Sequence, residues 1–210
     1  MQKKAQELKL ILLFIVFFFT SNLFPQPNTN FQYIGKYNDY PYSFINGEGK
    51  PDGFSIDLIE VIGKVMNFDV KVKLESSVQL NNDILYGNNF DISAVFYSEN
   101  REQSVEFSAP VLFSEAEIYI RKETKNINSI TDLMDKQVAV EEGSFAEEYL
   151  ERNFPKKNLV LTESIPATLE ELSQGKCDAV IAERIVSERS IAQLGLTNIK
   201  TTAYPVIPRE

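Results

Sequence analysis

Apolar positions along this chain follow two periods, and the alternation between the two predicts its elements. From Phe54 onward, apolar residues recur at spacings of three and four, which is typical of an amphipathic helix. Residues 69–74 instead alternate apolar residues with lysines, which is typical of a half-buried strand. The predicted strands are residues 31–35, 69–74, 91–95, 138–140, 159–164, 178–183 and 198–201, and the predicted helices are one that begins at Phe54 and residues 78–87, 145–154, 166–177 and 185–194.

This repeated alternation of strand and helix is typical of α/β proteins with mainly parallel sheets flanked by helices. At 210 residues the chain can form one large domain or two small lobes. Open α/β sheets bind ligands at the carboxyl ends of their strands. We therefore predict an α/β fold and expect a ligand site at such an edge.

One such edge falls within residues 91–113. The apolar run Ile92–Phe96 favours a buried strand, a polar turn follows at Ser98, and Arg101 comes next. The planar guanidinium of Arg101 is suited to gripping a carboxylate with two parallel hydrogen bonds. The alternative is a solvated surface arginine, and these residues alone leave both interpretations open.

Composition narrows the chemistry that this site can perform. The formal charge is −9, there is no histidine, and the single cysteine is Cys177. A negative balance disfavours nucleic acid or an anionic membrane surface as a partner. The absence of histidine argues against zinc sites and histidine-based catalysis, so no metal or cofactor is expected. One cysteine cannot form an internal disulfide.

The N-terminus is typical of an exported protein. Three lysines within the first nine residues precede an apolar run at residues 10–19, which predicts a signal peptide over residues 1–26 and a periplasmic or other extracytoplasmic location. The run is short for a membrane span, which needs about 20 residues. Extended from Leu8 to Phe24, it leaves an uncleaved anchor open, and we expect membrane contact only through this segment.

The stretch after Asp91 resembles family 3 of the bacterial extracytoplasmic solute-binding proteins. The signature of that family is an aspartate, an apolar strand, a small polar turn, an arginine and then Phe-Ser-x-Pro. The variant with Phe-Tyr-Ser before the arginine resembles the branch fused to sensor kinases and cyclases. The matching motifs are Asp91, Tyr97-Ser98-Glu99-Asn100-Arg101, Phe107-Ser108-Ala109-Pro110, Tyr40-Pro41-Tyr42-Ser43-Phe44, Gly53-Phe54-Ser55-Ile56-Asp57-Leu58, Leu133 to Val140 with Gly143-Ser144, and Gly175, Asp178-Ala179 with Glu183.

This resemblance implies a two-lobe, periplasmic-binding-protein-like fold of type II with a ligand cleft between the lobes. It covers roughly residues 31–207 and implies a first lobe at residues 27–110, a crossover or hinge at residues 111–121 and a second lobe at residues 122–210. Family members continue into a second crossover strand and a closing helix. The second lobe is therefore expected to be incomplete, with an uncovered sheet edge.

The resemblance also implies ligand contacts. Arg101 and the helix start at Gly143-Ser144 would hold a carboxylate, Glu183 would hold an amine, and a tyrosine would stack on the ligand. The alternatives are rings that fill the rim of the lobe, a routine helix cap, and a solvated glutamate at a helix start. The candidate ligand-binding residues are Tyr40, Tyr42, Tyr97, Ser98, Arg101, Gly143, Ser144 and Glu183.

Two departures from the family pattern bear on the ligand. Members that bind amino acids usually carry a small hydroxyl residue near the position of Phe96, and they often carry threonine at the position of Phe145. Fewer hydroxyls and more aromatic surface favour a less polar or aromatic ligand.

The function implied is capture of a small polar, amino-acid-like ligand or related carboxylate by hinge closure, for delivery to an ABC-type permease. The first alternative is a ligand-sensing domain, or its truncated relic, from a sensor kinase or cyclase. The second is a dehydratase-like enzyme on the same fold, in which Glu183 or Glu142 would have to serve as acid or base. We predict a binding protein rather than an enzyme.

Overall fold

The computed structural model describes residues 30–87, 89–154 and 158–209, and Phe31–Glu210 form one compact unit. The predicted signal peptide or anchor at residues 1–26 lies outside the described residues. Within the described ranges, no helix is long and apolar enough to cross a membrane.

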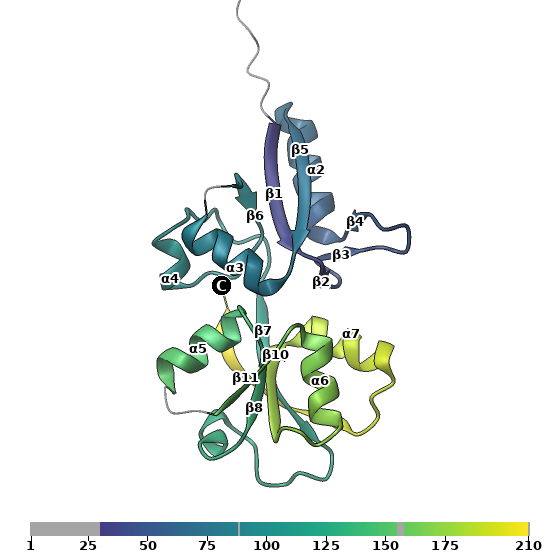
Figure 1. The fold of residues 1–210 in the computed structure, drawn as a ribbon, viewed down its shortest axis with the longest axis vertical. Coiled ribbons are helices and arrows are strands. Elements are labelled where there is room, and N and C mark those ends of the chain that lie inside the picture. Colours follow the sequence, from purple (N-terminus) through teal and green to yellow (C-terminus); the bar gives the residue numbers. More distant parts are fainter. Residues whose placement is uncertain (1–29, 88, 155–157, 210) are drawn as a thin grey trace, which may run out of the picture. The chain divides into compact units, whose positions relative to one another are not determined.

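The first lobe is built on a three-stranded sheet with the order β5-β1-β6 (Figure 1). Successive side chains of β1 point to opposite faces, so Tyr33 packs with Ile56 of α2 while Ile34 packs with Leu80 of α3. The two helices therefore cover opposite faces of this sheet. The elements of this lobe are β1 (Asn30–Lys36), β2 (Asn38–Asp39), β3 (Ser43–Ile45), β4 (Pro51–Asp52), α2 (Phe54–Met66), β5 (Asp69–Glu75), α3 (Ser77–Tyr86), β6 (Ile92–Ser93) and α4 (Glu99–Glu102).

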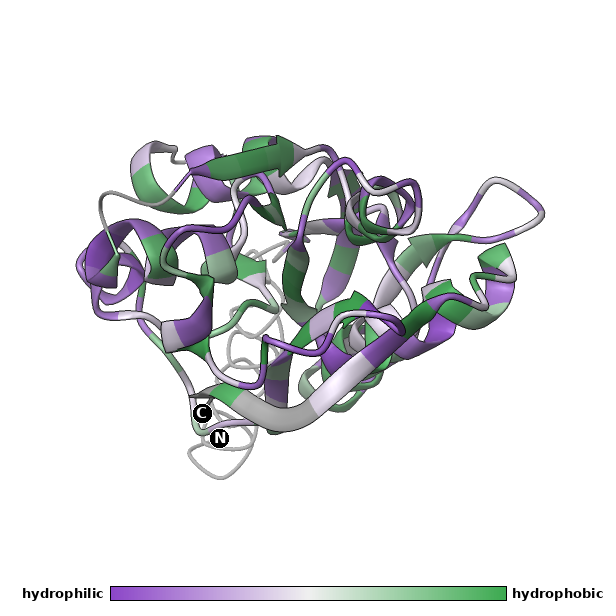
Figure 2. Cartoon of the chain, turned by 90° about the horizontal axis from the view of Figure 1, so that it is seen from below, coloured by the Kyte–Doolittle hydropathy of each residue, from purple (hydrophilic) through white to green (hydrophobic). Residues whose placement is uncertain are grey.

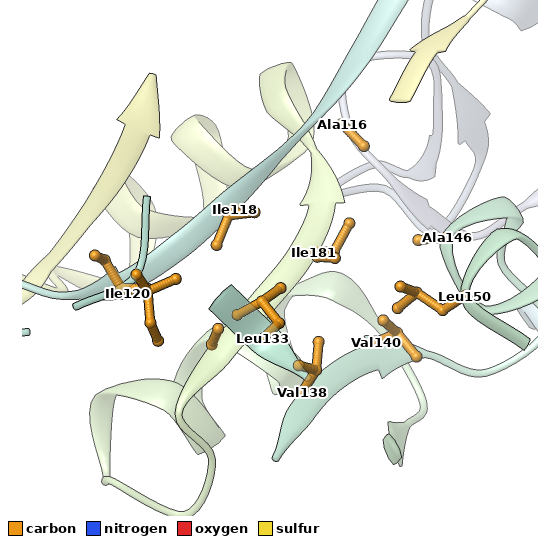
Figure 3. Close-up of a cluster of buried hydrophobic side chains, with 11 residues drawn as sticks. Ala116, Ile118, Ile120, Leu133, Val138, Val140, Ala146, Leu150 and Ile181 are labelled. Carbon is orange, nitrogen blue, oxygen red and sulfur yellow. The ribbon is translucent and has the colours of Figure 1, made fainter. Parts of the chain in front are cut away.

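The second lobe is built on a five-stranded mixed sheet with the order β11-β7-β10-β8-β9. Strand β8 lies parallel to β9 and β10, whereas β7 lies antiparallel to β10 and β11. One face of the sheet packs on α5 through the cluster shown in Figure 3, and the other packs on α6 and α7. The elements of this lobe are β7 (Ser114–Arg121), η1 (Ile130–Leu133), β8 (Val138–Glu141), α5 (Phe145–Asn153), β9 (Leu159–Thr162), α6 (Ile165–Ser173), β10 (Ala179–Glu183), α7 (Arg184–Leu194) and β11 (Ile199–Arg209).

Local sequence explains where the helices begin. Ser76, Ser144 and Ser164 each accept a hydrogen bond from a backbone N–H three residues later, so a serine hydroxyl satisfies a donor that the first turn leaves free. The helices carry both hydrophobic and hydrophilic residues, seen as bands of green and purple in Figure 2, which is typical of amphipathic helices.

Strand β11 differs from the expectation. A strand was expected only over residues 198–201, together with an uncovered sheet edge, but β11 pairs with β7 from Ile199 opposite Arg121 to Arg209 opposite Ser114. The crossover expected at residues 111–121 includes β7, which is an inner strand of this sheet. The sequence did not predict the full length of β11 because this segment contains Pro205 and Pro208, and proline disfavours strands in general. Proline is tolerated at the edge of a sheet, which is where β11 lies.

Candidate functional site

The carboxyl ends of strands from both lobes border one cavity of about 930 Å³. Strand β1 ends at Lys36, β8 at Glu141 and β10 at Glu183, and all three side chains line the cavity. Its volume falls within the range of about 300–1,000 Å³ that is usual for small-molecule sites. The cavity is therefore a cleft between the lobes. Each lobe borders it with the carboxyl edge of its sheet, which is where α/β proteins bind ligands.

Arg101 reaches the cleft from α4 of the first lobe. The hydroxyl of Ser98 begins this helix by accepting a hydrogen bond from the backbone N–H of Arg101 at 3.2 Å. The guanidinium donates from Nη1 to the carbonyl of Phe96 at 3.1 Å and from Nη2 to Oδ1 of Asn81 at 3.3 Å. Arg101 is only 5% exposed, so the alternative of a solvated surface arginine is wrong.

The third nitrogen of this guanidinium, Nε, is buried without a hydrogen-bond partner among the described residues. It lies 3.7 Å from the carboxylate of Glu148 on α5 of the second lobe. Burial lowers the pKa of Arg101 below its usual value, and the charge of Glu148 offsets only part of this effect. A buried cation whose nearest carboxylate is this distant can still gain from a closer anion.

Glu183 faces the same cleft from the second lobe and is 4% exposed. Its Oε2 accepts a hydrogen bond from the backbone N–H of Val186 at 2.7 Å and so caps α7. Its Oε1 accepts from the hydroxyl of Tyr42 at 3.3 Å and from the hydroxyl of Ser114. The carboxylate thus caps a helix, as one alternative had it, but it is buried rather than solvated. None of these three partners is a cation.

Lys36 joins the two lobes inside the cleft. Its ammonium lies 2.7 Å from the carboxylate of Asp39 in the first lobe and 3.0 Å from that of Glu141 in the second. Burial lowers the pKa of Lys36, but the charges of Asp39 and Glu141 outweigh burial and raise it above its usual value. The sequence analysis did not single out these three residues. Lys36 and Glu141 could have been found, because each ends a strand.

The turn at Gly143-Ser144 lies between β8 and α5 and lines the cleft. Its backbone donors are engaged within the chain: the N–H of Gly143 donates to Oε2 of Glu147 at 2.6 Å, and the N–H of Ser144 donates to the carbonyl of Glu141 at 3.2 Å. The hydroxyl of Ser144 accepts from the N–H of Glu147 at 3.2 Å. Gly143 has a φ of +73°, and a Cβ there would lie 2.8 Å from the carbonyl oxygen of Ser77 in the first lobe. The turn therefore touches the opposite lobe.

The tyrosine candidates separate into two groups. Tyr42 and Tyr97 line the cleft, whereas Tyr40, like Ser98, is not among its lining residues. The hydroxyl of Tyr97 donates to Glu102 at 2.7 Å. The ring of Tyr40 packs against Phe44 and lies 4.9 Å from the guanidinium carbon of Arg189 in α7. Burial and the charge of Glu183 raise the pKa of Tyr42 to about 12.

A large part of the cleft wall is apolar and comes from the core of the first lobe. No set of three or more Asp, Glu, Cys or His side chains in the described ranges could hold a metal ion. The apolar cleft residues used below are Leu80, Ile84, Phe90, Val105 and Phe145.

Two lobes of α/β structure around a charged and apolar cleft define a periplasmic-binding-protein fold of type II. The chain belongs to the bacterial extracellular solute-binding proteins, family 3, whose sequence profile matches residues 33–184. It is a member of a family of binding proteins and is not an enzyme, so the dehydratase alternative is set aside.

The probable amino-acid-binding protein YxeM of Bacillus subtilis (strain 168) is 28% identical to this chain over 171 residues, which cover 80% of this chain and 64% of YxeM. The L-cystine-binding protein TcyJ of Escherichia coli (strain K12) is 24% identical over 155 residues, which cover 70% of this chain and 56% of TcyJ. The chain therefore spans less than two thirds of the length of these curated relatives.

Among solved structures, a histidine kinase sensor domain with similarity to periplasmic binding proteins matches with a TM-score of 0.81 and 26% identity. The match covers 88% of this chain and 81% of that chain.

Proposed function

We propose that the chain captures a small amino-acid-like solute outside the cytoplasmic membrane and closes its two lobes around it. One observation carries this proposal: Arg101 of the first lobe and Glu183 of the second face the same cleft with opposite charges. Among the described residues, Nε of Arg101 has no hydrogen-bond partner, and none of the hydrogen-bond partners of Glu183 is a cation. A ligand that carries both a carboxylate and an ammonium supplies what each side chain lacks.

Such a ligand favours closure because its two charges are held by different lobes. A ligand shifts a conformational equilibrium only by its difference in affinity between the two states. An open cleft offers the ligand one of the two partners, whereas a closed cleft offers both. Binding of the zwitterion is therefore coupled to closure of the lobes.

The first experiment screens the free amino acids by thermal shift and measures the best ligand by calorimetry. A ligand that binds only the native state raises the melting temperature by mass action. Arg101→Ala is expected to weaken binding by about 2–5 kcal/mol, the range for truncating one member of a buried charge pair.

Arg152→Ala is the matched control, because Arg152 pairs with Glu99 across the lobes and is 62% exposed. An exposed pair contributes at most about 1 kcal/mol, so affinity is expected to change little. Equal affinities of the wild type and Arg101→Ala would remove Arg101 from the site.

We also propose export through residues 1–26, followed by a first lobe at residues 27–110, a crossover or hinge at residues 111–121 and a second lobe at residues 122–210. The family consists of extracellular proteins, which supports export. The exported protein is expected to be shorter than the translated chain by about 20–26 residues. A full-length cytosolic product in intact-mass measurement contradicts the proposal.

Delivery of the solute to an ABC-type permease and control of a signalling module are two candidate uses of this cleft. Similarity to YxeM supports the first, and similarity to the histidine kinase sensor domain supports the second. Uptake of the labelled ligand by cells with and without the gene separates them. Loss of uptake assigns transport, and unchanged uptake with altered ligand-dependent phosphorylation assigns sensing.

A further inference from the structure

We infer that the Lys36 ammonium fills a second cation position of the cleft when the lobes are together, so that the ligand is an amino acid with an uncharged, apolar side chain. This inference rests on the proposed function and names the ligand class of the same site. Three features of the cleft carry it: the place of the Lys36 ammonium, the distribution of the remaining carboxylates, and the apolar wall.

The Lys36 ammonium occupies a place that suits a positively charged ligand side chain. It lies between Asp39 and Glu141, which come from opposite lobes, at 2.7 and 3.0 Å. The side chain of Lys36 is 19% exposed and that of Glu141 is 4% exposed, so both charges are shielded from water. A ligand ammonium or guanidinium at this place would meet a like charge or would have to break both ion pairs of Lys36.

The other carboxylates on the cleft wall leave one buried position for a ligand cation. Asp91 and Glu106 are exposed, and Asp91 accepts a hydrogen bond from the N–H of Gln32 at 2.8 Å. Solvent screens such charges strongly. Glu183 is buried, and its hydrogen-bond partners within the described part of the chain include no cation. A ligand α-ammonium satisfies Glu183, and no second buried carboxylate of the described wall is left without a cation.

The apolar wall then determines which side chain fits. Leu80 and Ile84 of α3 line the cleft and are each at most 5% exposed. Phe90 and Val105 pack against the same cluster and also line the cleft, as does Phe145 of the second lobe. A charged or amide side chain packed against these hydrocarbon side chains would lose hydration without gaining a hydrogen bond from them. A branched or aromatic side chain would instead gain burial in proportion to its apolar area.

The test measures calorimetric affinities of leucine, phenylalanine, arginine and lysine for the wild type, Lys36→Met and Lys50→Met. Lys50 is the control because its side chain is 71% exposed and pairs only with Glu48 among the described residues. The wild type and Lys50→Met are expected to bind leucine or phenylalanine at least tenfold more tightly than arginine or lysine. In Lys36→Met the ratio is expected to shift toward arginine or lysine by at least tenfold.

Each outcome is decisive. A ratio in Lys36→Met equal to that of the wild type, or a wild type that prefers arginine or lysine, overturns the inference while the proposed function stands. A wild type that binds none of these four amino acids overturns the inference, and one that also binds no free amino acid in the thermal-shift screen overturns the proposed function as well. If Lys36→Met fails to fold because it leaves Asp39 and Glu141 without their cation, Lys36→Gln replaces it, since its amide can donate to both carboxylates. The preference of the wild type remains a test in either case.

Discussion

Adding one methyl group at Gly143 tests whether the two lobes approach each other in the ligand-bound protein as closely as they do in the structure. The residue belongs to the second lobe, and a Cβ built on it would lie 2.8 Å from both the carbonyl oxygen of Ser77 and the Cα of Val78 in the first lobe. These are backbone atoms, so no side-chain rotation can relieve the contact. Gly143→Ala therefore opposes closure directly.

The same substitution also strains the backbone, and a second glycine isolates that effect. Gly143 has a φ of +73° and Gly175 a φ of +77°, and nothing lies within 4 Å of a Cβ at Gly175. Alanine in this left-handed region costs about 1–2 kcal/mol at either position. Gly175→Ala thus reproduces the strain without the contact between lobes.

The magnitude of the contact follows from the distances. Ordinary van der Waals contact begins at 3.4 Å, so a Cβ at 2.8 Å requires the lobes to separate locally by roughly 0.6 Å, the difference between the two values. Overpacking of this kind costs about 1–3 kcal/mol. Because the cost falls only on the closed state, apparent ligand affinity is expected to fall roughly 5- to 140-fold at 1.4 kcal/mol per tenfold.

Two measurements separate strain from clash. Chemical denaturation is expected to show similar losses of stability in Gly143→Ala and Gly175→Ala. Calorimetry with the best ligand of the amino-acid screen is expected to show weakened binding in Gly143→Ala only. Equal affinities of the two variants would show that Gly143 does not approach Ser77 in the ligand-bound protein, which contradicts the prediction.

Three further predictions concern single residues. Leu169→Ala removes a fully buried side chain and is expected to lower the free energy of unfolding by about 2–5 kcal/mol in urea titration, a loss well under 1 kcal/mol being the contradicting result. Burial raises the pKa of the Cys177 thiol to about 11, so thiol reagents at pH 8 are expected to label it only after unfolding, and rapid native labelling would contradict this. The pKa of Tyr42 is raised from 10.0 to about 12, so its contribution to stability is fully present below pH 10 and is lost as the pH rises toward 12. Glu183→Gln is expected to lower the pKa of Tyr42 in ultraviolet titration, and an unchanged pKa would mean that the Glu183 charge does not act on this hydroxyl.

Local patterns in the sequence were sufficient for most of the fold. The expected helices at residues 145–154 and 185–194 correspond to α5 and α7, because their starts depend on Ser144 and Glu183 within one turn. Strand β11 was underestimated because its stability depends on pairing with β7, which local propensity does not contain. Tertiary pairing here overrode the signal of two prolines.

The site was predictable where it depends on one strand end and not where it depends on two lobes. The buried strand expected at residues 91–95 is wrong in extent, because β6 covers only Ile92–Ser93 and no residue of the run Ile92–Phe96 is buried. Arg101 nevertheless lies at the cleft, in the short helix that Ser98 caps. Lys36 and Glu141 are 105 residues apart, and only the approach of the lobes makes them partners. Tyr40 was expected at the cleft by motif, but its ring packs against Phe44, which the motif does not specify.

Glu183 serves two structures with one carboxylate, and this limits how the cleft can be redesigned. One oxygen holds the first turn of α7 while the other receives the hydroxyls of Tyr42 and Ser114. Random libraries that include position 183 will lose members to misfolding before any binding is scored, because most replacements release the helix end. A sensor for another solute is better built by keeping Glu183 and varying Tyr42 and Ser114. These substitutions change the hydrogen bonds to Oε1 of Glu183, which faces the ligand, and leave Oε2, which caps α7, in place.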